Sequence, residues 1–187
     1  MIRALAGGTQ IFLVRKGGIV EARRGFELRY PEFLLFPTFE HQHGRYLKAE
    51  YRDLVGQPAG TGDPVCISHL ARVAGAFRAP RSLAEIEPLA QCHIWNEEFL
   101  RQRYAYRPDL PLYLIMVRVY RLSEPRMIPL RPSYAGCKSW VHLTEEISIE
   151  RAAPVMDDGQ FEERRADLVA RISALSEGFE NGKQAAE

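Results

Sequence analysis

The sequence predicts an α+β domain: a strongly bent antiparallel sheet or small barrel-like core, two or three helices and a C-terminal amphipathic helix. Short apolar runs between glycine and proline turn signals fill the first forty residues, a pattern typical of antiparallel strands. Helix-capping patterns appear in the middle of the chain, and one apolar stripe with helical spacing lies near its end. At 187 residues, 46% of them apolar, the chain suits one globular domain. We place that domain at residues 1–150 and a helix docked on it at residues 157–180.

Strands dominate the predicted N-terminal part. Gly17-Gly18 can supply the positive φ angles of a tight hairpin turn, and Gly25 marks a second turn. The predicted strands are residues 10–15, 18–21, 26–30 and 33–36, which together indicate an antiparallel meander with little room for helix. Residues 48–55 are predicted to form one or two helical turns.

The middle of the chain mixes helices and strands. Ser82-Leu83-Ala84-Glu85 has the form of a capping box, and Asn96 with acidic residues behind it is a typical N-cap. Branched residues at alternate positions predict a strand over residues 65–77. Residues 111–122 are the clearest strand, and residues 126–130 and 139–143 are predicted as shorter ones.

The C-terminal segment carries a stripe of large apolar residues at spacings of seven, four, three and four: Phe161, Leu168, Ile172, Leu175 and Phe179. These spacings place the stripe on one face of a helix. An exposed stripe of this size would be an apolar patch, so it must be covered. The stripe is short for an independent coiled coil, and we therefore favour docking on the same domain over pairing with another chain.

Charge is divided unequally along the chain. Residues 1–143 hold 20 Lys/Arg and 13 Asp/Glu, whereas residues 144–187 hold 5 and 11. A basic body with an acidic tail suits an anionic ligand, and it equally suits a tail that neutralises the body. The 21 arginines and 4 lysines are scattered, so a compositional bias of the genome explains them more simply than a phosphate site does.

Cysteine content and hydropathy also indicate where in the cell the protein is expected. Three widely spaced cysteines, Cys66, Cys92 and Cys137, form neither a zinc pattern nor a disulfide framework, and we expect each to be a small buried side chain. The longest strongly apolar run, residues 110–117, is far shorter than the roughly 20 residues that span a bilayer. We expect a soluble cytoplasmic protein without a membrane partner.

The segment that follows residues 33–36 is the richest in polar chemistry. Thr38 leads into Glu40, His41, Gln42 and His43. In an extended chain His41 and His43 share one face, and two imidazoles at that spacing can hold zinc or iron. A third ligand would come from His69, His93 or Glu32. Histidines of this kind more often satisfy loop carbonyls, so metal binding is the lesser expectation.

Two other segments combine cations with groups that suit a nucleic acid. Arg15-Lys16-Gly17-Gly18 can form a backbone nest for an anion, although a solvated hairpin explains it as well, and no Walker or dinucleotide spacing is present. Lys138 and Trp140, in Gly136-Cys137-Lys138-Ser139-Trp140, offer a cation beside an aromatic ring. Base stacking with phosphate neutralisation needs that combination, but aromatic rings are also common in cores.

Several blocks resemble a bacterial family catalogued as a domain of unknown function, number 1802. They are Arg15-Lys16-Gly17-Gly18-Ile19, Glu32-Phe33-Leu34-Leu35-Phe36-Pro37-Thr38, Glu40-His41-Gln42, His93-Ile94-Trp95, Pro111-Leu112-Tyr113-Leu114, Arg118-Val119-Tyr120-Arg121-Leu122 and Gly136-Cys137-Lys138-Ser139-Trp140. The resemblance runs from about residue 4 to residue 145, and leaves out His43 and the C-terminal helix. Some relatives look linked to restriction-endonuclease-like domains, which implies an association with nucleic acid and restriction–modification.

Three functional hypotheses follow, none with a predicted cofactor or oligomeric state. The first is a ligand-binding module for nucleic acid. Its site would combine Arg15, Lys16, Gly17, Gly18, Thr38, Glu40, His41, Gln42, Lys138 and Trp140 in one cleft. The second is a metal-dependent hydrolase or nuclease centred on Glu40 and His41; the chain lacks the acid-x-Lys pattern of many Mg²⁺ nucleases. The third is a structural or interaction protein.

Overall fold

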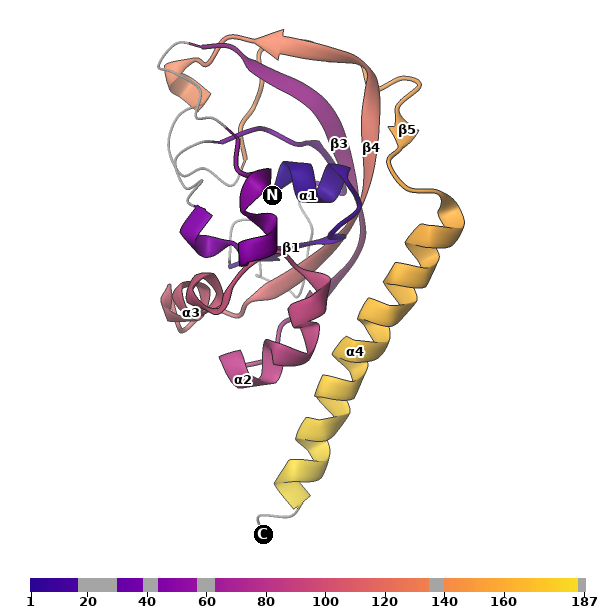
Figure 1. The fold of residues 1–187 in the computed structure, drawn as a ribbon. Helices are drawn as coiled ribbons and strands as arrows, with labels where there is room; N and C mark the ends of the chain where they lie inside the picture. The colour runs from indigo at the N-terminus through magenta and orange to yellow at the C-terminus, as the bar shows by residue number, and fades with distance from the viewer. Residues whose placement is uncertain (17–29, 39–43, 57–62, 135–139, 185–187) are drawn as a thin grey trace.

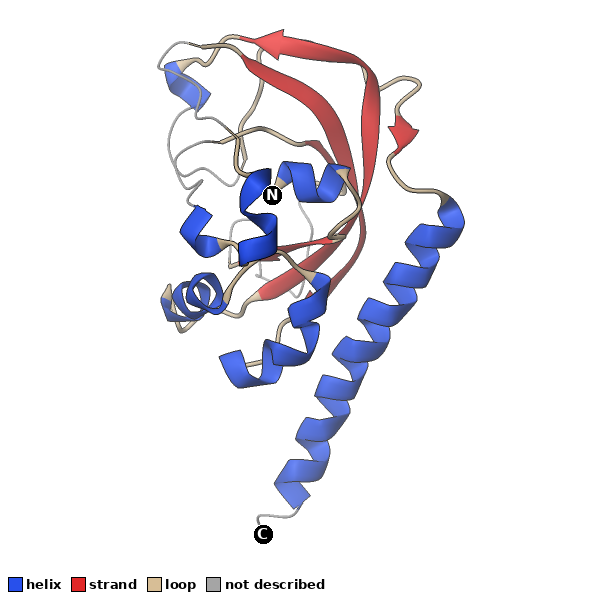
Figure 2. Cartoon of the chain, viewed as in Figure 1, coloured by secondary structure: helices blue, strands red, loops and turns tan. Residues whose placement is uncertain are grey.

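The computed structural model describes residues 1–16, 30–38, 44–56, 63–134 and 140–184, with side chains up to residue 175. In chain order, the elements are α1 (Ile2–Ala6), β1 (Phe12–Arg15), β2 (Glu32–Leu34), η1 (Gly44–Tyr46), η2 (Ala49–Leu54), β3 (Val65–Arg78), α2 (Leu83–Ile86), η3 (Glu87–Cys92), α3 (Glu97–Ala105), β4 (Tyr113–Ile128), η4 (Pro132–Tyr134), β5 (Ala153–Pro154) and α4 (Asp158–Gln184). The described strands form a five-stranded antiparallel sheet that is bent but not closed (Figure 2). The predicted α+β class is confirmed.

The sheet is built on two long strands, β3 and β4, which pair from Arg78↔Tyr113 to Val65↔Ile128. Register shifts at Ile67/His69 and Val73/Gly75 interrupt the ladder, and such bulges bend and twist a strand pair. The helices α2, η3 and α3 are inserted between the two strands, beside the sheet (Figure 1).

The edge strands have partners that the predicted meander did not include. β1 pairs with β4 and β2 pairs with β3, so the order is β1-β4-β3-β2 and the two N-terminal strands lie on opposite edges. Their partners lie far along the chain, and turn signals between neighbouring runs cannot reveal such pairing. Residues 2–6 form α1 where no helix was expected, residues 126–128 belong to β4, and residues 140–143 form no strand. Most of the predicted strands 18–21 and 26–30 falls outside the described residues.

Both predicted helix starts are confirmed. The Ser82 hydroxyl accepts a hydrogen bond from the Glu85 amide at 3.4 Å and donates to the Glu85 carboxylate at 2.9 Å, which completes the capping box. The Asn96 side chain accepts from the Phe99 amide at 3.1 Å and caps α3.

Side chains alternate between the two faces of the sheet. On one, which we call the helix face, Phe12, Leu114 and Met116 pack with residues of the helical insertion such as Ile94 and Leu100. On the other, the opposite face, Leu13, Ile115 and Val117 pack with Leu35 and Ala71. A third cluster around Val65, Ile128 and Tyr134 fills the far end of the long strands.

Buried Gln10 joins an edge strand to the helical insertion. Its side-chain amide donates to the Phe12 carbonyl at 2.5 Å and accepts from the Ile94 amide at 3.1 Å. The Phe12 carbonyl of β1 therefore has a hydrogen-bond partner inside the protein, where an unpaired carbonyl would be costly.

The long helix α4 runs along the outside of the body and extends beyond it at its C-terminal end (Figure 1). The Asp157 carboxylate accepts from the Gln160 amide at 2.8 Å and caps the helix. Phe161, Leu168 and Ile172 are buried in the cluster of the helix face. The guanidinium of Arg164 also donates to the Gly8 carbonyl, which lies after α1. No helix among the described residues has the length and apolar character needed to cross a bilayer.

Candidate anion-binding site

A row of side chains crosses the end of the sheet where β4 begins. Arg15 on β1 pairs with Tyr113 on β4, and Tyr113 pairs with Arg78 on β3. Directly paired residues point to the same face, so the side chains of two arginines extend from either side of one tyrosine on the opposite face. With strands about 4.8 Å apart, the backbones of the two arginines are separated by about 10 Å. We call Arg15, Tyr113 and Arg78 the basic row.

The C-terminal end of α3 lies beside this row. The Lys16 ammonium donates to the carbonyls of Arg103 and Tyr104, at 3.2 and 2.8 Å. A cation at a helix C-terminus is favourable because it meets carbonyls that have no partner within the helix. The Tyr104 hydroxyl donates to the Pro80 carbonyl at 2.9 Å, which ties the same helix end to the chain leaving β3.

The charges of the basic row are not compensated within the described part of the chain. Burial lowers the pKa of Arg15, and the nearby charge of Arg103 lowers it further. No ion pair to a carboxylate is found for Arg15, Arg78 or Arg103 among the described residues. Other arginines are paired, as in Arg72–Glu32, Arg118–Asp158 and Arg131–Glu145.

Two carboxylates act on the neighbours of the row, Glu85 on Tyr104 and Asp109 on Lys16, and each has another role. Both oxygens of Glu85 accept hydrogen bonds of the capping box at the start of α2. Asp109 acts on Lys16, whose pKa it raises against the larger lowering effect of burial. A half-buried arginine repelled by another arginine is costly, and an external anion would relieve that cost.

A second group of predicted site residues lies further along the same face. The Trp140 ring meets the rings of Tyr30 and Phe33 edge to face, at centroid distances of 4.8 and 5.3 Å. Trp140 packs in the cluster of the opposite face, and its Nε1 is buried with no hydrogen-bond partner among the described residues. Phe36 meets Tyr134 at 5.8 Å, so the chain leading to Thr38 lies next to the chain leading to residue 135.

The structure therefore separates the predicted site residues that it describes into two groups. Phe33 pairs with Ala71, which is seven residues along β3 from Arg78 in the basic row. At about 3.3 Å per residue, the aromatic cluster lies roughly 23 Å along the strand from the row. Arg15 and Lys16 belong to one end of the sheet, and Trp140 and the approach to Thr38 belong to the other group.

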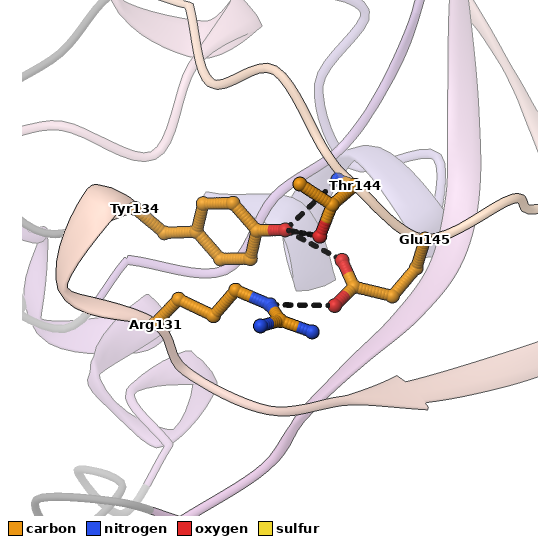
Figure 3. Close-up of polar contacts among 4 residues, drawn as sticks. All are labelled: Arg131, Tyr134, Thr144 and Glu145. Atoms are coloured by element: carbon orange, nitrogen blue, oxygen red, sulfur yellow. Dashed lines mark hydrogen bonds and ion pairs between the residues drawn. The ribbon is translucent and has the colours of Figure 1, made fainter.

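A polar network holds the chain on both sides of residues 135–143 (Figure 3). The Tyr134 hydroxyl donates to the Glu145 carboxylate at 2.5 Å and accepts from the Thr144 amide at 2.9 Å. The Arg131 guanidinium donates to the other oxygen of Glu145 at 2.9 Å. The hydrogen bond from Tyr134, more than the Arg131 guanidinium, lowers the pKa of Glu145 to about 2. A carboxylate held in this way stays ionised over the physiological pH range.

Replacing Tyr134 by phenylalanine should raise the pKa of Glu145 toward its ordinary value near 4.5. The loss of the hydroxyl should also lower the free energy of unfolding by about 1 kcal/mol, a typical net value for one hydrogen-bonding group. NMR titration of the Glu145 carboxyl, together with urea unfolding, measures both effects. Tyr51→Phe, which removes a half-buried hydroxyl elsewhere, is the matched control and should leave Glu145 unchanged. A Glu145 pKa that stays near 2 in Tyr134→Phe would show that Arg131 dominates instead.

The remaining predicted site residues, Gly17, Gly18, Glu40, His41, Gln42, His43 and Lys138, lie outside the described residues, so their roles stay predictions. The suggested third metal ligands lie in separate surroundings: Glu32 pairs with Arg72, His69 Nδ1 lies 2.8 Å from the Ser68 hydroxyl, and His93 is buried. Over the described ranges, no group of three or more His, Cys, Asp or Glu side chains could hold a metal ion. Cys66 is exposed, which corrects its expected burial, and Cys92 is half-buried.

Sequence reasoning missed Arg78 and Tyr113. Arg78 lies just past the predicted strand 65–77 and Tyr113 near the start of the predicted strand 111–122, each with an ordinary local sequence. Only the register of β1 with β4 and of β4 with β3 brings them beside Arg15. The one available signal was that strand ends next to helical insertions often carry site residues.

By its fold and this surface, the chain is an α+β protein with an open antiparallel sheet. One end of that sheet carries two arginines that have no carboxylate partner among the described residues. The sequence model of the family described as "Domain of unknown function (DUF1802)" matches residues 1–167, and the chain belongs to this family. The match reaches beyond residue 145 and includes the first part of α4, which the resemblance had left out. No curated protein and no solved structure matches the chain.

Proposed function

We propose that this protein is a nucleic-acid-binding module whose basic row contacts the phosphate backbone. The observation that carries the proposal is the pair of arginines that flank Tyr113 without a carboxylate partner among the described residues. Guanidinium groups bind phosphate through two parallel hydrogen bonds, and a bound phosphate would remove the repulsion between Arg15 and Arg103.

The separation of the two groups favours a polymeric anion over a small one. Both lie on the opposite face, roughly 23 Å apart, which is about seven phosphates at the 3.4 Å spacing of one DNA strand. A mononucleotide cannot reach both, whereas an oligonucleotide can. In this proposal Lys138 contacts further phosphates, Glu40 and Gln42 read polar base edges, and Trp140 contributes an aromatic ring.

The test is fluorescence anisotropy of labelled oligonucleotides, single- and double-stranded, DNA and RNA, over a salt series. Binding should weaken as salt rises, since each neutralised phosphate adds about 0.7 to 0.9 to the slope of log affinity against log salt. Arg78→Ala should weaken binding about tenfold. It should also reduce that slope by the amount that belongs to about one phosphate contact. Arg126→Ala, an exposed arginine at the far end of β4, makes the same charge change and should alter binding little.

The substitution Arg15→Met should lower the affinity for nucleic acid without lowering the stability of the protein. Methionine keeps the packing of the arginine stem but removes a charge that burial and Arg103 both disfavour. The free energy of unfolding should therefore stay equal or rise, while affinity for nucleic acid falls about tenfold. Urea unfolding and anisotropy on the same preparations measure both.

Absence of binding to every oligonucleotide at low salt would overturn the proposal. So would binding that Arg15→Met and Arg78→Ala leave at the wild-type level. In either case the charges of the basic row would have to be explained by contacts within the protein.

A further inference from the structure

Tyr106 and Arg107, directly after α3, form an exposed aromatic step. Tyr106 is 53% exposed, although large apolar side chains are mostly buried in this protein. The Arg107 guanidinium lies over the Tyr106 ring, 5.7 Å from its centroid. Arg107 has a φ of 46°, a left-handed conformation that side chains rarely adopt, and it precedes a proline. The turn thus holds an aromatic ring in solvent with a cation against it.

This step follows the last turn of α3, whose Arg103 acts electrostatically on Arg15 of the basic row. Tyr106 is two residues after Tyr104, whose carbonyl accepts from Lys16, the residue next to Arg15. The Tyr106 amide donates to the Gln102 carbonyl at 3.0 Å, which fixes the exit of the chain from α3. Asp109, in the same turn, interacts electrostatically with Lys16. The exposed ring therefore belongs to the turn after the helix end that Lys16, the neighbour of Arg15 in the sequence, contacts.

We infer that Tyr106 is a base-stacking platform and that the module prefers single-stranded nucleic acid; the inference rests on the proposed function. A phosphate on the basic row places its nucleotide next to the α3 exit, within reach of an exposed ring. Aromatic side chains stack on any base, and Arg107 adds a cation–π contribution to that stack. Bases in a duplex are already stacked and paired, so they are not available to this ring. Specificity for single strands follows from stacking, whereas the basic row alone would bind both forms.

The experiment compares wild type, Tyr106→Ala and Tyr106→Phe with three probes: a single-stranded oligonucleotide, the corresponding duplex and an abasic single strand. Wild type should bind the single strand more tightly than the duplex. Tyr106→Ala should lose about tenfold in affinity for the single strand and change little with the duplex or the abasic strand. Tyr106→Phe keeps the ring and should behave as wild type. DNA and RNA versions of the single strand show whether the sugar matters.

The outcomes separate the two proposals. If Arg78→Ala weakens binding while Tyr106→Ala binds single strands as wild type does, stacking is wrong and the phosphate site stands. A wild-type preference for duplex, or an equal loss with the abasic strand, also overturns the inference. If no oligonucleotide binds, both proposals fail. Tyr106 is exposed at a turn, so its replacement should leave the fold intact, and an unchanged Tm for Tyr106→Ala checks this.

Discussion

Replacing Leu168 by alanine should lower the free energy of unfolding by about 2 to 5 kcal/mol, as expected for a large-to-small change in a packed core. Leu168 is 2% exposed and belongs to the same cluster as Phe12 and Leu89. It joins α4 to the body, since α4 contacts η3 in that cluster. The cavity left by the deleted methyl groups would lie between a helix and the rest of the core. Urea unfolding followed by circular dichroism measures the loss.

Glu163→Ala is the control on the same helix, because Glu163 is exposed and has no ion pair among the described residues. That change should stay within about 0.5 kcal/mol of wild type. Deleting residues 157–187 extends the test, since it removes Phe161, Leu168 and Ile172 from the cluster together and should cause unfolding or aggregation. A truncated chain that stays monomeric and equally stable would show that α4 contributes nothing to the core.

Mild acid should destabilise the protein through His93. This side chain is 3% exposed, and burial, assisted by the charge of Lys48, lowers its pKa to about 4 from the ordinary 6.5. Between pH 6.5 and pH 4 the imidazole is therefore protonated in the unfolded chain but neutral in the folded protein. The free energy of unfolding is at its full value above about pH 6.5 and falls as the pH drops toward 4. At 1.36 kcal/mol per pKa unit, the loss is on the order of 3 kcal/mol. Urea unfolding at a series of pH values measures it.

His93→Leu should remove most of this pH dependence, because leucine fills a similar space and no hydrogen bond of the ring nitrogens is lost among the described residues. His69 has a pKa that burial lowers in the same direction, so a smaller dependence should remain. The control is His142→Asn, which removes an imidazole at an exposed position. An unfolding free energy that is flat between pH 7 and pH 4 would mean that His93 titrates freely in the folded protein.

Local features of the fold were predictable because their causes lie within a few residues of chain. The capping interactions of Ser82 and Asn96 join residues three apart, so their sequence patterns suffice to locate α2 and α3. The spacing of Phe161, Leu168 and Ile172 places them on one face of α4 for the same reason, and this face is buried. The apolar run that begins at Tyr113 likewise indicated the central strand.

The order of the strands and the candidate site depended on contacts between distant parts of the chain. Nothing near residue 15 indicates that β1 pairs with β4 about a hundred residues later, and the predicted meander did not include that pairing. The register of that pairing, together with β4 on β3, decides that Arg15 and Arg78 flank Tyr113 and that Trp140 lies further along the sheet. By itself the sequence determined the helix starts, the central strand and the apolar face of α4, because hydrogen bonds and periodicity act locally. The tertiary structure alone decided which cations lie on neighbouring strands without a counter-charge in the described part of the chain, because that follows from which strand edges pair and in what register.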